Sequence, residues 1–547
     1  MAQAAVQPAR PVAAKQQQKQ QEQNPWLILI VVCTAVFMLL LDTTIVNNAQ
    51  VKIKESLGAN LNQIQWVLDS YILTYAVLLL SFGRLGDVYG RKKLFILGMS
   101  IFTIASGLCA TSAWVGDTLN IAGINFLIAS RVLQGFGGAL MMPQTLSLLT
   151  VAFPPEKRGA AFGVWGSVTA LGAVIGPVIG GLIVTNFAWE WVFLINLPVG
   201  ALSILAAFKI IPESKDPLAS NRIDWGGLVL SGTAIFSLVY ASIEGNKKGW
   251  TSPLILGMYL LAAVLIAVFI WWERRSADPM MKLELFKIRN FSIGTTISLI
   301  VTFGMLGIFF PMTIFLQQVL GFSPIRAGLT MTPMSVMIMV SAPFAGRFTD
   351  KIGARWIMVT GLLFMAGGIL FIVSRIDLDT TWKTLFPALV VTGFGMGMTF
   401  SPMTAASMGE VPPRIAGSAS GVLNTARNLG QVLGIAVLGS VLQNRLGVNV
   451  ADQLQTTTIP ADLQAQVVEV AKQSQFELLP SFVPTGLMDT VWSNVQIAFV
   501  DSLHSTFFVG AVACFIAAGL GVLIRNPAPR VATASAPNEK PAVVAAD

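Results

Sequence analysis

Hydrophobic residues fill long stretches of this chain, and polar residues gather between them. The apolar stretches are close to the length of about 20 residues that a helix needs to cross a bilayer, and they recur from Trp26 to Ile524. Strands of a membrane barrel would alternate over segments of about ten residues, and the sequence has no such segments. The pattern therefore predicts an all-α integral membrane protein embedded in the lipid bilayer. Fourteen transmembrane helices are expected at residues 26–47, 62–82, 93–112, 121–150, 160–184, 191–211, 225–243, 253–272, 291–316, 328–348, 356–374, 385–408, 417–442 and 504–524.

Polar segments lie at both ends of the chain and before the last predicted span. Residues 1–25 and 525–547 are rich in Gln, Ala and Pro, and we expect disordered tails there. An even number of spans places both tails on one side, together with most of the 35 lysines and arginines, which predicts cytoplasmic N and C termini. The acidic segment 446–503 then lies outside, either as a disordered loop or as a lid or docking surface for a periplasmic adaptor protein.

The sequence repeats itself over its two halves. When the chain is shifted by 258 residues, Gly135 falls on Gly393 and Gly159 falls on Gly417. Two related halves that rock around a shared cleft are a common plan of transporters. We expect six-helix bundles at 26–211 and 291–524, joined by a linker at 212–290 with two extra helices. A shift of 263 residues aligns Gly83, Arg84, Asp87 and Gly90 with Gly346, Arg347, Asp350 and Gly353.

Composition excludes several classes of chemistry. Only 11% of the residues are charged, against roughly 25% in soluble proteins, and 54% are hydrophobic. The net charge of +8 lies mostly in short loops between spans, so we expect no nucleic-acid partner. The three cysteines stand far apart in apolar runs, His504 is the single histidine, and the sequence has no nucleotide-binding motif of the G-x-x-x-x-G-K-[ST] form. We therefore expect no metal, no cofactor and no enzyme activity, and we expect the proton-motive force to supply the energy.

Three charged residues lie deep inside predicted spans of the first half. Asp42, Asp69 and Arg131 lie at similar depths on three helices of the first half, counted at 1.5 Å per residue. Charges within a bilayer are costly unless they pair or face water, so they mark a transport pathway by default. We expect Asp42 to exchange protons, Asp69 to be a second acidic contact and Arg131 to tune the carboxylate. The alternatives are a structural ion pair that locks the helices and, for Asp69, an interfacial position near the mouth.

Glycine-rich motifs indicate where helices bend or approach closely. The loop after the second span is expected to act in gating through Gly83, Asp87, Gly90 and Arg91, and its repeat through Gly346, Asp350 and Gly353; the alternative is an ordinary basic loop. In the fifth predicted span, glycines at four-residue spacing permit close helix packing and a proline adds a bend. These residues are Gly172, Gly176, Pro177, Gly180 and Gly181.

Several polar and aromatic residues are candidates for a substrate cavity. Arg427 lies about 15 Å into its span, where it would contact substrate or Glu410, or else bridge two helices by a hydrogen bond. The other candidates are Asn47, Gln134, Phe303, Phe310 and Gln317.

The motifs together resemble a known family. Gly83 to Lys93 is similar to the loop motif of the major facilitator superfamily, Arg131 to Gly135 to its fourth-helix motif, and Gly172 to Gly181 to its antiporter motif. Leu41 to Asn47 resembles the first-helix motif of the fourteen-span drug/proton antiporter subfamily, and Trp191 to Pro198 also looks like that subfamily. The resemblance implies a proton-coupling role for Asp42 and Arg131 and a bend at Pro177 that seals against leak. One departure is that Leu389 stands where the repeat of Arg131 would fall.

The sequence thus predicts a proton-coupled antiporter of the bacterial inner membrane that exports lipophilic, cationic drugs by alternating access. Its partners would be protons and small amphipathic molecules, and we expect a monomer. An exporter of one metabolite, such as an amino acid, siderophore or lipid, is the alternative. A non-transporting sensor on the same scaffold would need a signalling domain, for which neither tail has the composition.

Overall fold

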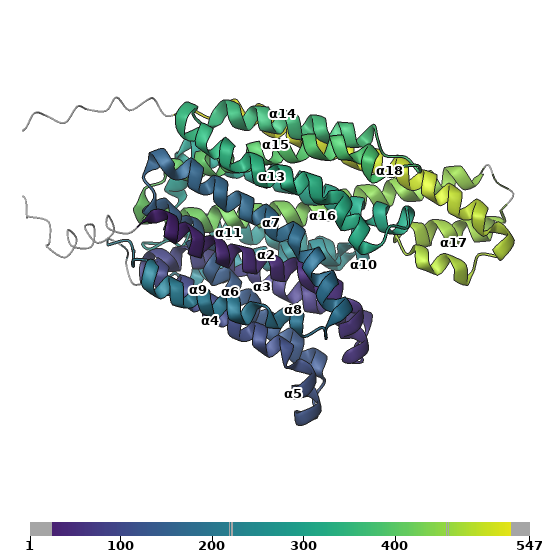
Figure 1. Cartoon of the computed structure of the whole chain (residues 1–547), viewed down its shortest axis with the longest axis horizontal. Coiled ribbons are helices and arrows are strands. Elements are labelled where there is room, and N and C mark those ends of the chain that lie inside the picture. The colour runs from purple at the N-terminus through teal and green to yellow at the C-terminus, as the bar shows by residue number, and fades with distance from the viewer. Residues whose placement is uncertain (1–23, 218, 220–222, 456, 458, 527–547) are drawn as a thin grey trace, which may run out of the picture.

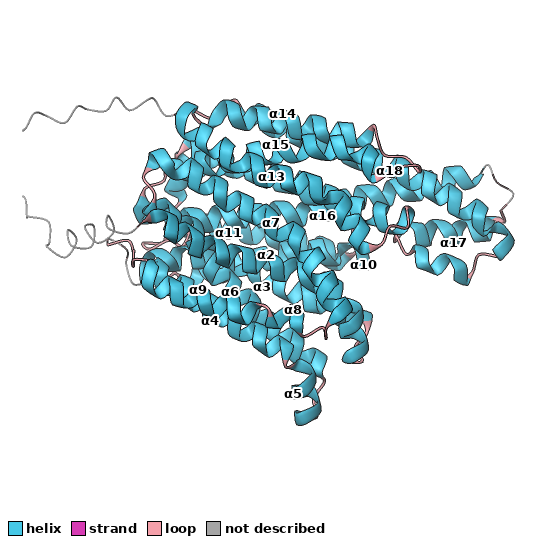
Figure 2. Cartoon of the chain, in the orientation of Figure 1, coloured by secondary structure: helices cyan, strands magenta, loops and turns pink. Residues whose placement is uncertain are grey.

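The computed structural model describes residues 24–217, 219, 223–455, 457 and 459–526. Within these ranges the regular structure is helical and no strand occurs (Figure 2). The predicted tails at 1–25 and 525–547 therefore lie almost wholly outside the described residues. The first half consists of α2 (Pro25–Ser56), α3 (Leu61–Tyr89), α4 (Arg91–Ala110), α5 (Ser112–Leu119), α6 (Gly123–Ala152), η1 (Pro155–Lys157), α7 (Arg158–Asn186), α8 (Trp191–Leu194) and α9 (Asn196–Ile210).

Two further helices, α10 (Trp225–Lys248) and α11 (Pro253–Glu273), follow and pack against each other. They lead into the second half, in which one hydrophobic core runs from Ile297 to Ile524. This half consists of η2 (Leu283–Lys287), α12 (Arg289–Ile314), the π-helix η3 (Phe315–Val319), α13 (Pro324–Ile352), α14 (Ala354–Val373), α15 (Trp382–Gly409), η4 (Pro413–Ile415), α16 (Ala416–Gln455), α17 (Ala461–Lys472), η5 (Phe476–Ser481) and α18 (Thr485–Gly521).

The two halves meet along two seams. In one seam α7 packs along α13 (Figure 1). In the other seam α3 packs along α16. Each seam thus joins one helix of each half. The inserted helix α10 contacts both α3 and α16, so it lies over the second seam.

Twelve helices of the described residues are long and apolar enough to cross a membrane. They coincide with twelve of the fourteen predicted spans. The remaining two predictions, 160–184 and 291–316, fall on α7 and α12, which are helices of 29 and 26 residues. Fourteen crossings therefore stay a prediction.

The segment 446–503, predicted as an external loop, is mostly helical. The span predicted at 417–442 continues to Gln455 as a helix of 40 residues, and α18 begins at Thr485, before the predicted 504. The composition of Ala461 to Lys472 predicts a helix, and α17 spans these same residues. The extensions of α16 and α18 into the segment were not predicted, because average polarity hides an apolar stripe at helical spacing. The external position of the segment stays a prediction. The apolar side chains of α17 and of the two extensions are buried together in one cluster. They are Leu446, Val450, Leu454, Val467, Ala471, Val491 and Val495.

Candidate functional site

The carboxylate of Asp42 lies at the centre of the first half and is fully buried. Its Oδ2 accepts a hydrogen bond from Arg131 Nη1 at 2.6 Å. Its Oδ1 accepts from Gln134 Nε2 at 2.8 Å and from Asn196 Nδ2 at 3.1 Å. Each of these three partners is an N–H donor, so the arrangement suits an ionised carboxylate. The predicted pairing of Asp42 with Arg131 is present, and α2, α6 and α9 all contribute to it.

Arg131 is held on several sides. Its Nη1 also donates to Gln134 Oε1 at 2.6 Å, and its Nε donates to the carbonyl oxygen of Val67 at 3.1 Å. Its guanidinium carbon lies 4.1 Å from the ring centroid of Tyr71, a cation–π contact. Arg131 and Gln134 share one face of α6 because they are three residues apart. The guanidinium is therefore fixed relative to α3 as well as to Asp42.

Asn196 is a member of this site that the sequence analysis did not single out. Its Nδ2 bonds both Asp42 and Ser106 Oγ, the latter at 3.0 Å, and the Ser106 hydroxyl donates to the carbonyl oxygen of Phe193 at 2.9 Å. Asn196 stands at the first position of α9, directly after the break from α8. A lone buried amide at a helix break, followed by Pro198, was the available signal.

Asp69 is partly buried on α3. It lies within one helical turn of Val67 and Tyr71, the two residues of α3 that contact Arg131. Its role as a second acidic contact stays a prediction.

The predicted gating loop contacts the other half of the protein. Asp87 is fully buried, and its two carboxylate oxygens accept hydrogen bonds from the backbone N–H groups of Gly417 and Ser418, each at 2.8 Å. Arg91 Nη2 donates to Asp87 Oδ1 at 2.6 Å and to the carbonyl oxygen of Pro413. Gly417 and Ser418 open α16, so Asp87 sits at the positive end of that helix.

The repeat of this loop makes the reciprocal contact. Asp350 of α13 accepts hydrogen bonds from the backbone N–H groups of Gly159 at 2.7 Å and Ala160 at 2.9 Å, in the first turn of α7. Gly90 and Gly353 end α3 and α13 with φ of 111° and 89°, where a side chain would be strained. The predicted loop residues are thus brought together, and the structure adds helix N-termini as their partners.

Glycines permit this close approach of the two halves. A Cβ atom on Gly83 would lie 2.6 Å from the carbonyl oxygen of Gly417 and 2.7 Å from Cα of Gly421. At the other seam, a Cβ on Gly346 would overlap the carbonyl oxygen of Gly159. The seam at these positions is therefore made by backbone against backbone.

Three of the antiporter-motif glycines pack against α2, which is the close helix packing that their spacing predicts. A Cβ on Gly172 would lie 2.9 Å from Cβ of Leu40, and one on Gly180 would lie 3.0 Å from the carbonyl oxygen of Ile45, both on α2. Gly176 faces Thr44 on the same helix, whereas a Cβ on Gly181 would lie 3.8 Å from Cγ1 of Ile325 on α13. The motif packs α7 onto the helix that carries Asp42. The side chain of Pro177 lies outside the described residues.

The residues predicted to line one substrate cavity are dispersed. Arg427 Nη2 donates to Thr404 Oγ1 at 2.5 Å, which bridges α16 and α15, while Glu410 accepts from Asn290 instead. Gln134 belongs to the Asp42 site. Of the other candidates, Asn47 is exposed near the end of α2, Phe303 packs against Gly434, Gln317 lies in η3, and the side chain of Phe310 lies outside the described residues.

The segment after α9 is bonded to the first gating loop. The N–H of Asp216 donates to the carbonyl oxygen of Asp87 at 2.8 Å, and the N–H of Arg91 donates to the carbonyl oxygen of Ser214 at 3.0 Å. Lys282, which precedes α12, pairs with Asp216 at 3.6 Å. Burial and the nearby Arg84 guanidinium lower the pKa of Lys282, and Asp216 opposes this only in part.

Comparisons with known proteins agree with this architecture. The sequence profile described as Major Facilitator Superfamily matches residues 32–435. The chain is 32% identical to the tetracenomycin C resistance and export protein of Streptomyces glaucescens, over 89% of each chain. It is 34% identical to the multidrug resistance protein Stp of Mycobacterium tuberculosis, over 78% of each chain. The human organic anion transporter MFSD10 superposes with a TM-score of 0.56 at 14% identity, covering 90% of this chain and 100% of that one.

Proposed function

Because this chain belongs to the major facilitator superfamily, we propose that it exports lipophilic, cationic compounds in exchange for protons by alternating access. The observation that carries the proposal is the fully buried carboxylate of Asp42. The names of two relatives, which refer to export and to multidrug resistance, support the direction of transport and the breadth of substrate.

Competition for Asp42 provides the coupling. An ionised carboxylate within a membrane is tolerated only while donors such as Arg131, Gln134 and Asn196 compensate its charge. Protonation removes the charge and weakens all three hydrogen bonds, which frees α6 and α9 to move relative to α2. A cationic substrate that approaches the site favours the ionised form, so proton and cargo take turns. A proton that crosses 100 mV supplies about 2.3 kcal/mol for each cycle.

The two aspartate contacts at the seams provide the gate. With Asp87 bonded to α16 and Asp350 bonded to α7, the halves are joined at the end of the molecule that we assign to the cytoplasm. Hydrogen bonds to charged groups contribute about 1.5–3 kcal/mol each. Opening toward the cytoplasm breaks both contacts, and substrate and proton binding must offset that cost.

The proposal includes the finer topology expected from the sequence. We assign α7 and α12 as the two further spans, which gives fourteen crossings with both termini in the cytoplasm of a bacterial inner membrane. The chain would act as a monomer without a cofactor. The segment 446–503, which comprises the end of α16, α17 and the start of α18, would be the docking surface for a periplasmic adaptor protein.

A second candidate is export of one natural product, since one relative is named for resistance to and export of a single compound. Both candidates use the same coupling site and differ in substrate range.

Everted membrane vesicles test the proposal. Ethidium uptake should begin when a pH gradient, acidic inside, is imposed and should stop when a protonophore dissipates it. The Asp42→Asn variant should insert normally and show no gradient-driven uptake. Uptake by that variant at the wild-type rate would contradict the proposal, whereas gradient-driven transport of one compound alone would select the second candidate.

A further inference from the structure

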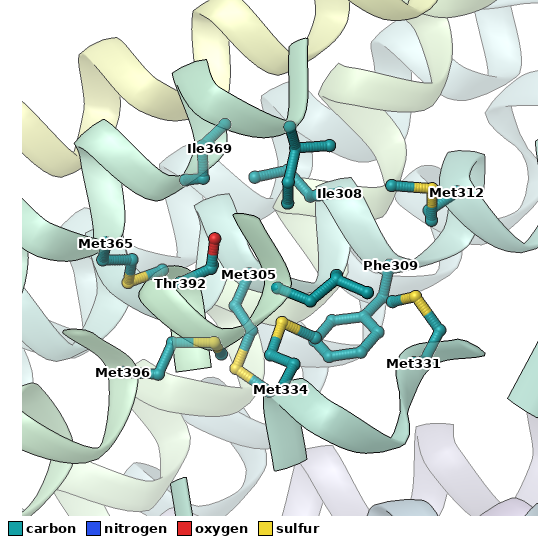
Figure 3. A pocket seen from close by; sticks show the side chains of 12 residues that line it. Met305, Ile308, Phe309, Met312, Met331, Met334, Met365, Ile369, Thr392 and Met396 are labelled. Carbon is teal, nitrogen blue, oxygen red and sulfur yellow. The ribbon is translucent and has the colours of Figure 1, made fainter. Parts of the chain in front are cut away.

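An apolar pocket lies inside the second half, between α12, α13, α14 and α15 (Figure 3). The one hydroxyl in the lining, that of Thr392, already donates to the carbonyl oxygen of Ala388 at 2.8 Å. Among the described residues, the lining therefore offers no free hydrogen-bond donor. Half of its lining consists of methionines, namely Met305, Met312, Met331, Met334, Met365 and Met396.

The internal repeat relates this methionine pocket to the Asp42 site. The shifts of 258 and 263 residues that align the two halves carry residues of the Asp42 site onto residues that line the pocket. Leu389, Thr392 and Met334 stand where Arg131, Gln134 and Tyr71 stand in the first half. Ile372 stands at the place of Cys109, whose Sγ lies 3.7 Å from Gln134 Oε1.

Backbone packing confirms that the two places are equivalent in space. A Cβ on Gly137 of α6 would lie 2.8 Å from the carbonyl oxygen of Gly98 on α4. At the repeated positions, a Cβ on Gly395 of α15 would lie 2.7 Å from the carbonyl oxygen of Gly361 on α14. The same helix pair thus crosses at the same residues in both halves. One half places charged and amide groups beside this crossing, and the other places thioethers.

We infer that the methionine pocket binds an uncharged, polarisable aromatic group, so that the proton site and an apolar ligand site occupy equivalent places in opposite halves. This inference deepens the proposed function, on which its role in transport rests. None of the described residues that line the pocket is ionisable, so a charged group would find no partner among them. Thioethers make favourable contacts with aromatic rings, and apolar cavities of this kind remain free of water.

Methionine also explains how a small pocket would admit a ring. Only about 20 Å³ of the space would accept the centre of a water molecule, so the side chains must rotate before a ligand enters. Methionine has three rotatable bonds and adapts to differently shaped neighbours, as on other promiscuous binding surfaces. Rotation of Met331, Met334 and Met305 around Phe309 would widen the pocket without displacing a helix (Figure 3).

Equilibrium binding of a neutral aromatic dye tests the inference. The full-length protein in lipid nanodiscs would be dialysed against N-phenylnaphthylamine without any ion gradient, with empty nanodiscs as the reference. The double variant Met334→Leu/Met396→Leu keeps the volume and removes two sulfurs, and it should bind the dye about tenfold more weakly. The matched control is Met358→Leu/Met403→Leu, since both methionines are fully buried in the same half outside the pocket lining, and it should bind like the wild type.

A second variant fills the pocket. Thr392→Phe should abolish specific dye binding, and the methionine variants decide the question if this bulkier change prevents folding. Equal binding by the wild type and by both methionine variants would overturn the inference. Asp42→Asn should retain dye binding while it loses proton-driven transport. Failure of the pocket and failure of the coupling site are therefore separate outcomes.

Discussion

Asp87 and Asp350 make the same contact in opposite directions. Asp87 belongs to the first half and accepts two backbone hydrogen bonds from the start of α16 in the second half. Asp350 belongs to the second half and accepts two from the start of α7 in the first. Each helix end is favourable for a carboxylate because its first N–H groups lack partners within the helix. The repeated loop motif is therefore a reciprocal latch between the halves.

Neutralising the carboxylate of Asp87 or of Asp350 should separate the two halves at the end of the molecule where these contacts lie. In Asp350→Asn, the side chain turns either an amide oxygen or an amide N–H toward two backbone donors, and at least one strong hydrogen bond is lost. Spin labels would be placed on Lys157→Cys and Lys351→Cys, both of which are exposed positions. We expect the distance distribution from double electron–electron resonance to gain a component at longer distance. Asp87→Asn should act similarly. The exposed Asp379 provides the control, and Asp379→Asn should leave the distance distribution unchanged.

Added bulk at the seam should have the same effect without any change of charge. The methyl group of Gly83→Ala would lie 2.6 Å from the carbonyl oxygen of Gly417, so the closed seam cannot form as it stands. We expect slower ethidium transport and the longer label distance. In Gly367→Ala the methyl group would meet nothing within 4 Å, and transport should remain normal. A normal distance distribution in Gly83→Ala would refute the role assigned to the seam.

The amide of Asn196 should set the pH at which transport operates. Asn196→Ala removes one of three donors that stabilise the ionised form of Asp42, so protonation becomes easier and occurs at higher pH. The midpoint of the pH profile of ethidium efflux should therefore rise. Ser106→Ala, which leaves the Asn196–Asp42 contact intact, should move the midpoint less.

Lys282 should make the free energy of unfolding depend on pH in the alkaline range. Its pKa is lowered in the folded protein by burial and by Arg84, so between that pKa and the ordinary value of about 10.4 the unfolded chain binds more protons. Stability gained from this group therefore increases as pH rises through that window. The melting temperature of the wild type relative to Lys282→Met should rise from neutral pH toward pH of about 10. A constant difference would show that Lys282 titrates as it does in the unfolded chain.

The sequence was informative where burying a charged residue costs free energy that a partner must offset. A carboxylate and a guanidinium in apolar runs must find partners, and this predicted that Asp42 meets Arg131. The repeat identified Asp87 and Asp350 as equivalent. Across the seam, both aspartates bond backbone N–H groups, which leave no side-chain signature in the sequence, so these contacts between the halves were not predicted.

Asn196 and the methionine pocket were missed because neutral side chains do not require a partner that the sequence would reveal. Asn196 costs less to bury than a charge and stands in a short break between α8 and α9. The methionines of the pocket come from four helices and are abundant elsewhere, so only the fold reveals that Met334 and Met396 meet. Within 446–503, the composition of Ala461 to Lys472 indicated a helix, but the polar faces of α16 and α18 hid their extensions into this segment. The spacing of the glycines at 172, 176 and 180 predicted close packing but did not identify α2 as the helix they approach.

The most direct test is to observe the protonation of Asp42 itself. Infrared difference spectroscopy on the reconstituted full-length protein detects a protonated carboxyl group by its C=O band, and Asp42→Asn identifies which band belongs to this residue. We expect the band to appear as pH falls and to disappear when ethidium is added at constant pH. A band that is absent at every pH, or that ethidium leaves unchanged, would contradict this expectation.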